Sequence, residues 1–335
     1  MHTVVGPSLP SSRPSRSGSD PIVGTVLDGD FEVIALAGSG SHADVFSAKQ
    51  RSVGNRRVAL KILARPYLSL KEADFRKAAA ALVREGELLG ALHAPCFVDV
   101  YRTGFLPDHR PYLAEEFAEG RALSDVCSAG PRLRDDQVGD LISQWADGLA
   151  EMHLRGWVHR DVTPANVVVS ETVFGTMRIQ VYDFGTATQI SGRMDRHRVG
   201  FDLDRPVGTP AYMSPEQATG GLVDGRSDQY ALAAIAYELL TGVRALSIDV
   251  QRAQPLLDYL RGNGTIPCKP LSSLRPDLPF AVQQVLHRGM ERSADKRFET
   301  AIELARQLSA ALAGVDLPKT SGTSWVSRLW RGAKR

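Results

Sequence analysis

The 335-residue chain is predicted to be an α+β protein in two lobes, with strands in its first part and helices in its second. Up to about residue 117, short apolar runs alternate with glycine-rich and polar turns, as strands do. From about residue 135, apolar residues recur at helical spacing. The Glu119-Gly120 pair between these parts is a plausible hinge.

The first part contains five candidate strands and one candidate helix. Apolar and β-branched runs predict the strands, and the helix is rich in Ala, Leu and Glu with few breakers. The predicted strands cover residues 31–34, 45–48, 58–63, 97–101 and 112–117, and the helix covers 72–92.

The second part is predicted to be helical. Asp135 or Asp136 can cap a helix that runs to about Leu154. Further helices are predicted near 227–241, 279–290 and 299–313. These elements give a folded domain over 27–314, with an N-lobe at about 27–117 and a C-lobe at about 121–314. Residues 1–26 are predicted to be a disordered tail, in which 1–21 are rich in Ser, Pro, Arg and Gly, and 315–335 form a basic, tryptophan-containing tail.

Composition narrows the class of protein. A formal net charge of +2 gives no reason to expect a nucleic-acid partner. Cys96, Cys127 and Cys268 lie far apart and form neither a disulfide framework nor a metal-ligand spacing, which favours a reducing cytoplasm. The N-terminus lacks a signal-peptide core, and the absence of a run of roughly 18 apolar residues predicts no transmembrane helix.

The most informative segment is 159–166, HRDVTPAN, which puts a carboxylate and a carboxamide on one short loop. Asp161 and Asn166 are five residues apart, and Asp183 follows Asn166 by seventeen residues in an Asp-Phe-Gly triplet. Hard cations favour carboxylate and carboxamide oxygens. These three side chains could therefore hold a reacting hydroxyl and metal ions.

A second motif is the glycine-rich segment 38–45, GSGSHADV, which is predicted to lie between the first two strands. Glycines let backbone N–H groups approach phosphate oxygens closely. Alone, such a hairpin is more often only a turn. Lys61 strengthens the phosphate interpretation, because it follows on the predicted strand 58–63, although a lone Lys is usually a solvated residue.

Together these motifs resemble those of eukaryotic-type (Hanks-type) protein kinases: G-x-G-x-x-G-x-V, V-A-I-K, H-R-D-x-x-x-x-N and D-F-G. Segment 208–217, GTPAYMSPEQ, is similar to the end of the activation segment in bacterial serine/threonine kinases. The resemblance covers roughly 27–313. It implies a bilobal protein kinase fold and transfer of the γ-phosphoryl group of ATP to a protein Ser or Thr hydroxyl, in bacterial signalling.

The resemblance also implies roles for single residues. Asp161 would be the catalytic base, and Lys61 would contact the phosphates and pair with Glu85. Glu87 lies on the same predicted helix, but the register counted from His93 favours Glu85. Asn166 and Asp183 would hold Mg²⁺. The residues expected to bind the nucleotide are Gly38, Ser39, Gly40, Val45, Ala59 and Lys61, with Glu116 and Ala118 at the hinge.

Other residues are expected to have structural roles. His159 and Phe184 resemble members of a packed spine between the lobes, with Leu89 as a third. In the same resemblance Glu216 pairs with Arg297, and Asp228 on a buried helix anchors the catalytic loop.

Two positions depart from the family pattern. Thr163 stands where most serine/threonine kinases carry Lys, and the lost ammonium should weaken stabilisation of the transition state. Glu115 falls at the gatekeeper position, where a carboxylate is costly unless it is protonated or paired. Either Glu115 finds a partner, with Lys61 as the candidate, or this register is wrong by one residue.

The activation segment and the C-terminal tail leave alternatives open. Between Gly192 and Gly208 there is no Ser, Thr or Tyr, so Asp202 or Asp204 could pair with Arg160 in place of a phosphoresidue, or the loop is simply acidic and solvated. Candidate phosphosites nearer the Asp-Phe-Gly triplet are Thr186, Thr188 and Ser191. Residues 320–335 could contact the inner membrane face or a partner, but a basic tail that is frayed or packs on its own domain is more common.

Three functions are therefore compared. A serine/threonine protein kinase is favoured. A nucleotide-binding pseudokinase that acts as a scaffold is motivated by Thr163 and Glu115, but the intact Lys61, Asp161 and Asp183 count against it. A small-molecule phosphotransferase of the same fold would not be expected to carry the 208–217 segment.

Overall fold

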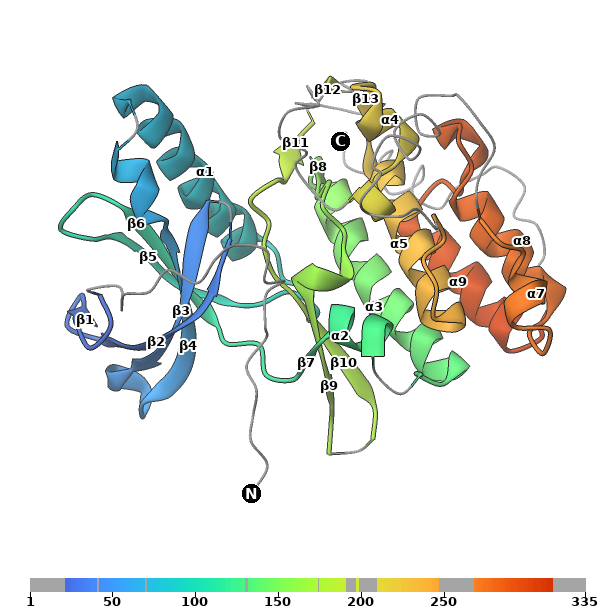
Figure 1. Cartoon of the computed structure of the whole chain (residues 1–335), viewed down its shortest axis with the longest axis horizontal. Helices are drawn as coiled ribbons and strands as arrows, with labels where there is room; N and C mark the ends of the chain where they lie inside the picture. The colour runs from blue at the N-terminus through green and yellow to red at the C-terminus, as the bar shows by residue number, and fades with distance from the viewer. Residues whose placement is uncertain are drawn as a thin grey trace, which may run out of the picture.

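The computed structural model describes residues 22–40, 42–69, 71–129, 132–173, 175–190, 197–198, 210–246 and 268–315. It has two lobes, one built on a sheet and the other on helices, as Figure 1 shows. The predicted two-lobed α+β architecture is confirmed. Both predicted tails, apart from residues 22–26 and 315, and the proposed acidic pair Asp202 and Asp204 lie outside the described residues.

The N-lobe is a six-stranded antiparallel sheet with strand order β1-β2-β3-β4-β6-β5. One face buries an apolar cluster that includes Phe31, Phe46, Leu60 and Tyr112. The strands are β1 (Val26–Leu27), β2 (Phe31–Ser39), β3 (Ala43–Gln50), β4 (Arg56–Leu63), β5 (Val100–Phe105) and β6 (Pro111–Glu116).

The other face of the sheet is covered by helix α1 (Glu72–Ala91), which coincides with the predicted helix over 72–92. Its inward side presents Leu82, Leu88 and Leu89 to the core, and Glu85 is buried beside them. A buried carboxylate on an otherwise apolar helix face requires a partner. Helix α1 therefore places the Glu85 carboxylate on the side that faces the space between the lobes.

Two predicted boundaries were wrong. The strand expected over 97–101 begins only at Val100, and Phe97 makes a single bridge to Val181 of the C-lobe. The reason is packing, because the Phe97 ring lies edge-on against Phe184 at 4.9 Å instead of joining the sheet. Order also begins earlier than Val26, since Ile22 is buried in the N-lobe cluster.

The C-lobe is built around α3 and α5, which contact each other and both contact α9. The predicted helices near 135–154, 227–241, 279–290 and 299–313 are all present. The helices are α2 (Leu123–Ala129), α3 (Asp135–Leu154), α4 (Pro215–Ala218), α5 (Gly225–Thr241), α7 (Leu271–Leu274), α8 (Phe280–Gly289) and α9 (Ala301–Leu312). No helix among the described residues is long and apolar enough to span a bilayer.

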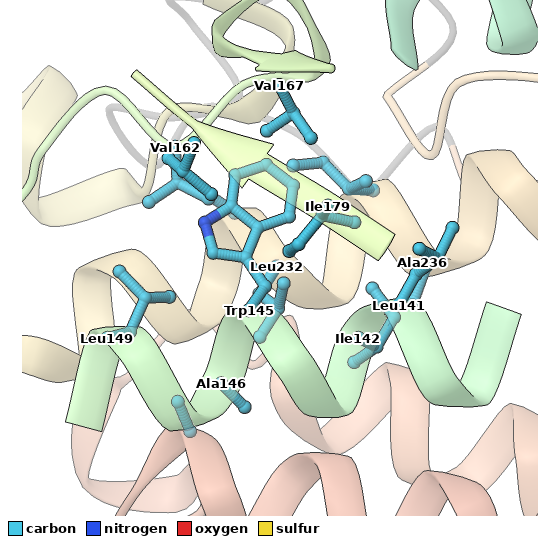
Figure 2. Close-up of a cluster of buried hydrophobic side chains, with 14 of the residues drawn as sticks. Leu141, Ile142, Trp145, Ala146, Leu149, Val162, Val167, Ile179, Leu232 and Ala236 are labelled. Carbon is cyan, nitrogen blue, oxygen red and sulfur yellow. The ribbon is translucent and has the colours of Figure 1, made fainter. Parts of the chain in front are cut away.

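Figure 2 shows the centre of this core, where the Trp145 indole of α3 lies among aliphatic side chains. Of these, Val162 belongs to the polar loop 159–166, Val167 directly follows it, and Ile179 comes from the adjoining strand. These apolar contacts anchor the loop on the core of the C-lobe. The short strands are β7 (Arg121–Ala122), β8 (Trp157–Val158), β9 (Val167–Glu171), β10 (Met177–Val181), β11 (Thr188–Gln189), β12 (His197–Arg198) and β13 (Leu222–Val223).

The connection between the lobes passes close to the backbone of β9. Gly120 has a φ of +147°, and a Cβ atom placed there would lie 2.2 Å from the carbonyl oxygen of Val169. Only glycine fits such a close backbone approach. At the predicted hinge, Glu119-Gly120, the backbone is therefore in close contact with strand β9 of the C-lobe.

Candidate active site

The loop between β8 and β9 carries two of the predicted polar residues side by side. Asn166 Nδ2 donates to the Asp161 carbonyl oxygen at 3.0 Å and to Asp161 Oδ2 at 3.1 Å. Asn166 is buried at the end of a 3-10 turn that starts at Pro164. Asp161 accepts both hydrogen bonds of the carboxamide nitrogen, so the carboxamide oxygen is not used in this pairing. The two side chains hold each other in place.

Asp228 of α5 anchors this loop from below. One carboxylate oxygen accepts the backbone N–H of His159 at 2.9 Å and the Nε2–H of His153 at 2.8 Å. The other accepts the backbone N–H of Arg160 at 2.8 Å. Burial alone would raise the pKa of Asp228, but the bonds from His153 and from these backbone groups outweigh it and lower the pKa below its ordinary value.

The anchor also explains an unusual backbone conformation. Arg160 has a φ of +68°, in the left-handed region that non-glycine residues rarely adopt. Its N–H bond to Asp228 and its carbonyl, which accepts Gln217 Nε2 at 2.8 Å, hold the peptide there. The role of Gln217 was not predicted, although its place in the 208–217 segment was an available signal.

Lys61 joins three elements through one ammonium group. Its Nζ donates to the two Glu85 oxygens at 2.6 and 2.9 Å and to Asp183 Oδ1 at 2.8 Å. The Lys61 side chain is 12% exposed and that of Glu85 only 2%. The structure thus brings together the predicted pair of β4 and α1, while Glu87 lies on the exposed side of α1.

The charges in this cluster depend on one another. Burial would lower the pKa of Lys61, but Asp183 and Glu85 together raise it above its ordinary value, so the ammonium stays charged. Lys61 in turn lowers the pKa of Asp183. For Glu85, burial raises the pKa and Lys61 opposes the rise. A neutral Lys61 would leave two carboxylates close together, so the cluster holds only while the ammonium is present.

The aromatic residues beside this cluster form a packed column. The Phe184 ring lies 4.8 Å from the His159 ring and 4.9 Å from Phe97. Leu89 is buried in the same apolar cluster as both phenylalanines. Phe184 N–H also donates to Glu85 Oε1 at 2.9 Å, so the column and the charge cluster are joined. Phe97 belongs to this column, although it was predicted to lie in a strand.

The glycine-rich segment turns between β2 and β3. Gly38 pairs with Val45 and Ser39 with Asp44, and Gly40 N–H donates to the Ala43 carbonyl at 2.8 Å. A Cβ atom on Gly40 would lie 3.1 Å from that carbonyl, so the tight turn favours glycine. Ser41 lies outside the described residues.

The inward face of the sheet continues from this turn. Val45 stands directly across from Lys61, and Ala59 directly across from Glu115. Directly opposed residues of an antiparallel pair point to the same face. Val45, Ala59, Lys61 and Glu115 therefore line one surface, which faces α1 and the C-lobe.

Glu115 occupies the predicted register, but Lys61 is not its hydrogen-bond partner. Its side chain is buried, with 6% exposed, and its Oε2 atom has no hydrogen-bond partner among the described residues. Lys61 donates its hydrogen bonds to Glu85 and Asp183, so it acts on Glu115 through its charge and not through a hydrogen bond. Burial raises the pKa of Glu115 to about 8, against the opposing effect of Lys61.

The hinge segment follows directly. Glu116 ends β6, its N–H donates to the Asp99 carbonyl at 2.8 Å, and its carboxylate lies 3.7 Å from Arg178 of β10. Ala118 is buried two residues later. Since the Glu116 side chain is occupied with Arg178, the backbone is the part of this segment that can contact a ligand.

The Arg160 guanidinium turns toward the segment that follows the Asp-Phe-Gly triplet. Its Nε donates to the Thr186 carbonyl at 2.6 Å, and the Thr186 hydroxyl donates to the His159 carbonyl at 2.8 Å. Burial lowers the pKa of Arg160, and Asp228 opposes this. Among the described residues, Arg160 thus binds a backbone carbonyl, and its predicted pairing with Asp202 or Asp204 lies outside them.

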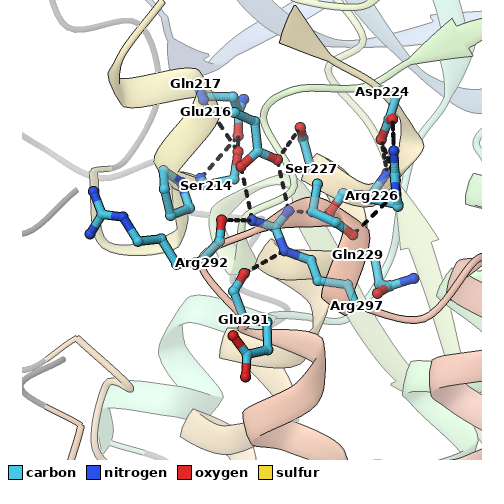
Figure 3. Close-up of polar contacts among 12 residues, drawn as sticks. Ser214, Glu216, Gln217, Asp224, Arg226, Ser227, Gln229, Glu291, Arg292 and Arg297 are labelled. Atoms are coloured by element: carbon cyan, nitrogen blue, oxygen red, sulfur yellow. Dashed lines mark hydrogen bonds and ion pairs between the residues drawn. The ribbon is translucent and has the colours of Figure 1, made fainter. Parts of the chain in front are cut away.

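The predicted pair of Glu216 and Arg297 is present, as Figure 3 shows. Arg297 Nη1 and Nη2 donate to the two carboxylate oxygens at 2.7 and 2.8 Å, and the Arg297 side chain is fully buried. Ser227 donates to the same carboxylate at 2.7 Å. Burial would raise the pKa of Glu216, but the bonds from Arg297 and Ser227 lower it. The pair ties α4 to the segment before α9, and the Ser227 bond ties α4 to the start of α5.

Thr163 lies within the polar loop 159–166, between Asp161 and Asn166. Its side chain is 3% exposed, and its carbonyl accepts the Asn166 N–H at 3.1 Å. The residue therefore packs in the loop and helps to shape its turn, but it contributes no positive charge.

Comparison with known proteins agrees with this geometry. The protein kinase domain family matches residues 31–304. The chain is similar to the serine/threonine-protein kinases pkn2 and Pkn1 of Myxococcus xanthus, with 34% and 33% identity over 85% and 92% of its length. It is also similar to the serine/threonine-protein kinase PrkC of Bacillus subtilis, with 28% identity over 87% of its length.

The matched regions make up 33%, 42% and 42% of those three relatives, so the chain spans well under half of each. The family match itself covers most of this chain, and its limits enclose β2 through the first turn of α9. The polar loop, the Lys61 cluster and the glycine-rich turn all fall inside those limits. The chain belongs to the protein kinase domain family.

Proposed function

We propose that the protein is an ATP-dependent serine/threonine protein kinase that acts in bacterial signalling. The observation that carries this proposal is the Lys61 ammonium bound by Glu85 and Asp183, above a loop that joins Asp161 to Asn166. Such an arrangement offers a cation for phosphate oxygens and a carboxylate for a hydroxyl group. The names of the relatives support Ser and Thr as the acceptor class.

The nucleotide would bind between the lobes. Val45 and Ala59 would cover the base from the sheet, and the backbone carbonyl of Glu116 and the N–H of Ala118 would bind its polar edge. The N–H groups of Gly38, Ser39 and Gly40 would face phosphate oxygens. Lys61 would bind the α- and β-phosphates, to which its bond with Glu85 directs it.

Magnesium fits the residues at the mouth of this site. Asp183 offers a carboxylate, and Asn166 offers the carboxamide oxygen that its bonds to Asp161 leave available. No group of three or more His, Cys, Asp or Glu among the described residues could hold a metal ion, so phosphate oxygens and water would complete the shell. Bound Mg²⁺ would neutralise charge on the β- and γ-phosphates.

Asp161 would act on the acceptor. Its carboxylate would accept a hydrogen bond from the substrate hydroxyl, orient the oxygen toward the γ-phosphorus and take up the proton as the new P–O bond forms. The bond from Asn166 fixes the carboxylate for this task. Asp228 holds the loop backbone through His159 and Arg160, so it is a positioning residue.

Labelled ATP tests the proposal directly. The purified chain is incubated with γ-labelled ATP, Mg²⁺ and a generic protein substrate, alongside Asp161→Ala and an Asp140→Ala control. Asp140 is an exposed carboxylate on α3, so this control removes the same group without touching the site. Label should appear with the wild type and Asp140→Ala and be lost with Asp161→Ala. Equal labelling by all three would contradict the proposal.

A nucleotide-binding scaffold is the second candidate, and the buried Thr163 and Glu115 favour it. Such a protein would bind Mg·ATP but leave it intact. The two candidates separate in one sample, because nucleotide binding without transferred label supports the scaffold, and mass spectrometry locates any phosphorylated residue if transfer occurs.

Cytoplasmic action is part of the proposal and rests on the three separate free cysteines. Contact of residues 320–335 with an anionic membrane or a partner stays a prediction, because that segment lies outside the described residues. Co-sedimentation with anionic liposomes, compared between the full chain and a chain lacking 320–335, tests the membrane alternative.

A further inference from the structure

Glu115 lies where a carboxylate is least expected in this site. Along β6, Tyr112 and Ala114 pack into the outer N-lobe cluster, whereas Leu113 packs into the core with α1. Side chains alternate between the faces of a strand, so Glu115 shares the inner face with Leu113. Ala59 and Lys61 of β4 stand on that same face, directly across from Glu115 and Leu113 respectively.

Lys61 and Glu115 stand on the inner face of the sheet, with the Glu85 carboxylate of α1 and the Asp183 carboxylate of the C-lobe beside Lys61. Glu85 and Asp183 take the hydrogen bonds of Lys61, at 2.6 and 2.8 Å. Glu115 is 94% buried, and its Oε2 atom has no hydrogen-bond partner among the described residues. Burial, reinforced by the two other carboxylates, raises the pKa of Glu115 despite Lys61. The residue is therefore a buried polar group with an unused oxygen.

Among the described residues, the neighbouring strands do not require a polar group at this position, and the Lys61 charge acts on Glu115 without a hydrogen bond. The strand neighbours of Glu115 are Ala59 on β4 and Val100 on β5, both apolar. A leucine would bury apolar surface there and avoid the cost of an unsatisfied oxygen. A carboxyl group is useful at such a place only if a ligand supplies the missing hydrogen bond.

We infer that Glu115 is a specificity-determining residue whose side-chain oxygen accepts a hydrogen bond from the exocyclic amino group of adenine. This inference rests on the proposed function, in which the Glu116 carbonyl and the Ala118 N–H bind the polar edge of the base. The amino group has two N–H bonds. One would go to the Glu116 carbonyl, and the second would point inward, to the side chain of the preceding residue.

Glu115 would favour a base with an amino group in either of its protonation states. A carboxylic acid offers its carbonyl oxygen as an acceptor, and a carboxylate offers both oxygens. A base with hydrogen in place of the amino group provides no donor and would leave the oxygen buried and unpaired. The site would then discriminate against that base because of the group left unsatisfied.

The test is a comparison of two nucleotides and three variants by calorimetry. The probes are Mg·ADP and the Mg²⁺ complex of purine riboside 5′-diphosphate, which differ only in the amino group. The wild type, Glu115→Leu, Glu115→Gln and the control Glu87→Leu are compared. Glu87 is an exposed glutamate on α1, so Glu87→Leu makes the same chemical change away from the cleft.

The expected readout is the ratio of the two dissociation constants. Glu115→Leu should reduce the preference for ADP about tenfold, the effect of one hydrogen bond, whereas Glu115→Gln keeps an acceptor and should retain most of it. Glu87→Leu should match the wild type. If Glu115→Leu does not fold, Glu115→Met carries the same expectation.

Two outcomes would overturn the inference, and they differ. An equal preference in the wild type and in Glu115→Leu, with ADP bound normally, would reject the role of Glu115 and leave the proposed function standing. No binding of either nucleotide by the wild type would reject both.

Discussion

Replacing Glu115 with leucine should stabilise the folded chain, and the gain should grow as the pH rises. In the folded chain, burial raises the pKa of Glu115 from 4.5 to about 8. Between these two values the folded chain holds a proton that the unfolded chain has released. The folded state therefore binds more protons, and the free energy of unfolding of the wild type falls as the pH rises through this window.

The size of the effect follows from the same shift. One unit of pKa difference corresponds to about 1.4 kcal/mol. Because the unfolded carboxyl is already mostly ionised at about pH 5, raising the pH to about 7 should cost the wild type about 2.5 kcal/mol through this group alone. The leucine variant lacks the group, so its advantage over the wild type should increase by that amount.

Urea denaturation followed by tryptophan fluorescence measures this difference. Trp145 is buried in the C-lobe core and should report unfolding. The wild type, Glu115→Leu and Glu115→Gln are compared at about pH 5, 6 and 7, so that all other titrating groups cancel. Glu115→Gln keeps the shape of the side chain but should lose the pH dependence. A stability difference that is constant over this range would refute the reasoning.

Three further changes test other parts of the site. Asp228→Asn removes an acceptor of the loop N–H groups and should lower kcat about 100-fold and stability by about 2 kcal/mol, measured by phosphoryl transfer and thermal unfolding. Arg297→Leu leaves Glu216 buried without its cation and should cost about 3–5 kcal/mol in urea denaturation, whereas the exposed Arg76→Leu should cost little. Thr163→Lys restores an ammonium beside the catalytic loop and should raise kcat about tenfold in steady-state assays, and an unchanged kcat would show that position 163 does not set the rate.

Long periodic segments were predictable because burial of one helix face dominates their structure. Segments 72–92 and 135–154 have such periods, and their helices match the prediction within a residue. Segment 97–101 was not predictable in the same way, because a short apolar run suits a strand and a core contact equally well. Phe97 was drawn out of the sheet by Phe184, which lies 87 residues further along the chain.

The candidate site was likewise predictable only in part. Lys61, Asp161, Asn166 and Asp183 carry functional groups whose types and spacing stand in the sequence. The hydrogen bonds that position these residues could not be predicted from the sequence. The bond from Gln217 to the Arg160 carbonyl, for example, depends on how two distant loops meet.

The two unusual residues of the site change its charge in the same direction. Thr163 omits an ammonium that would face the γ-phosphate, and Glu115 adds a carboxyl beside the ammonium that remains on Lys61. An ionised Glu115 would set three carboxylates against one cation, in a cleft that receives a polyphosphate under the proposed function. Its pKa of about 8 keeps the carboxyl mostly protonated at neutral pH, so Lys61 faces only Glu85 and Asp183. Burial of Glu115 thus avoids a third negative charge beside Lys61, and the missing ammonium at position 163 bears on the rate of transfer and not on this balance.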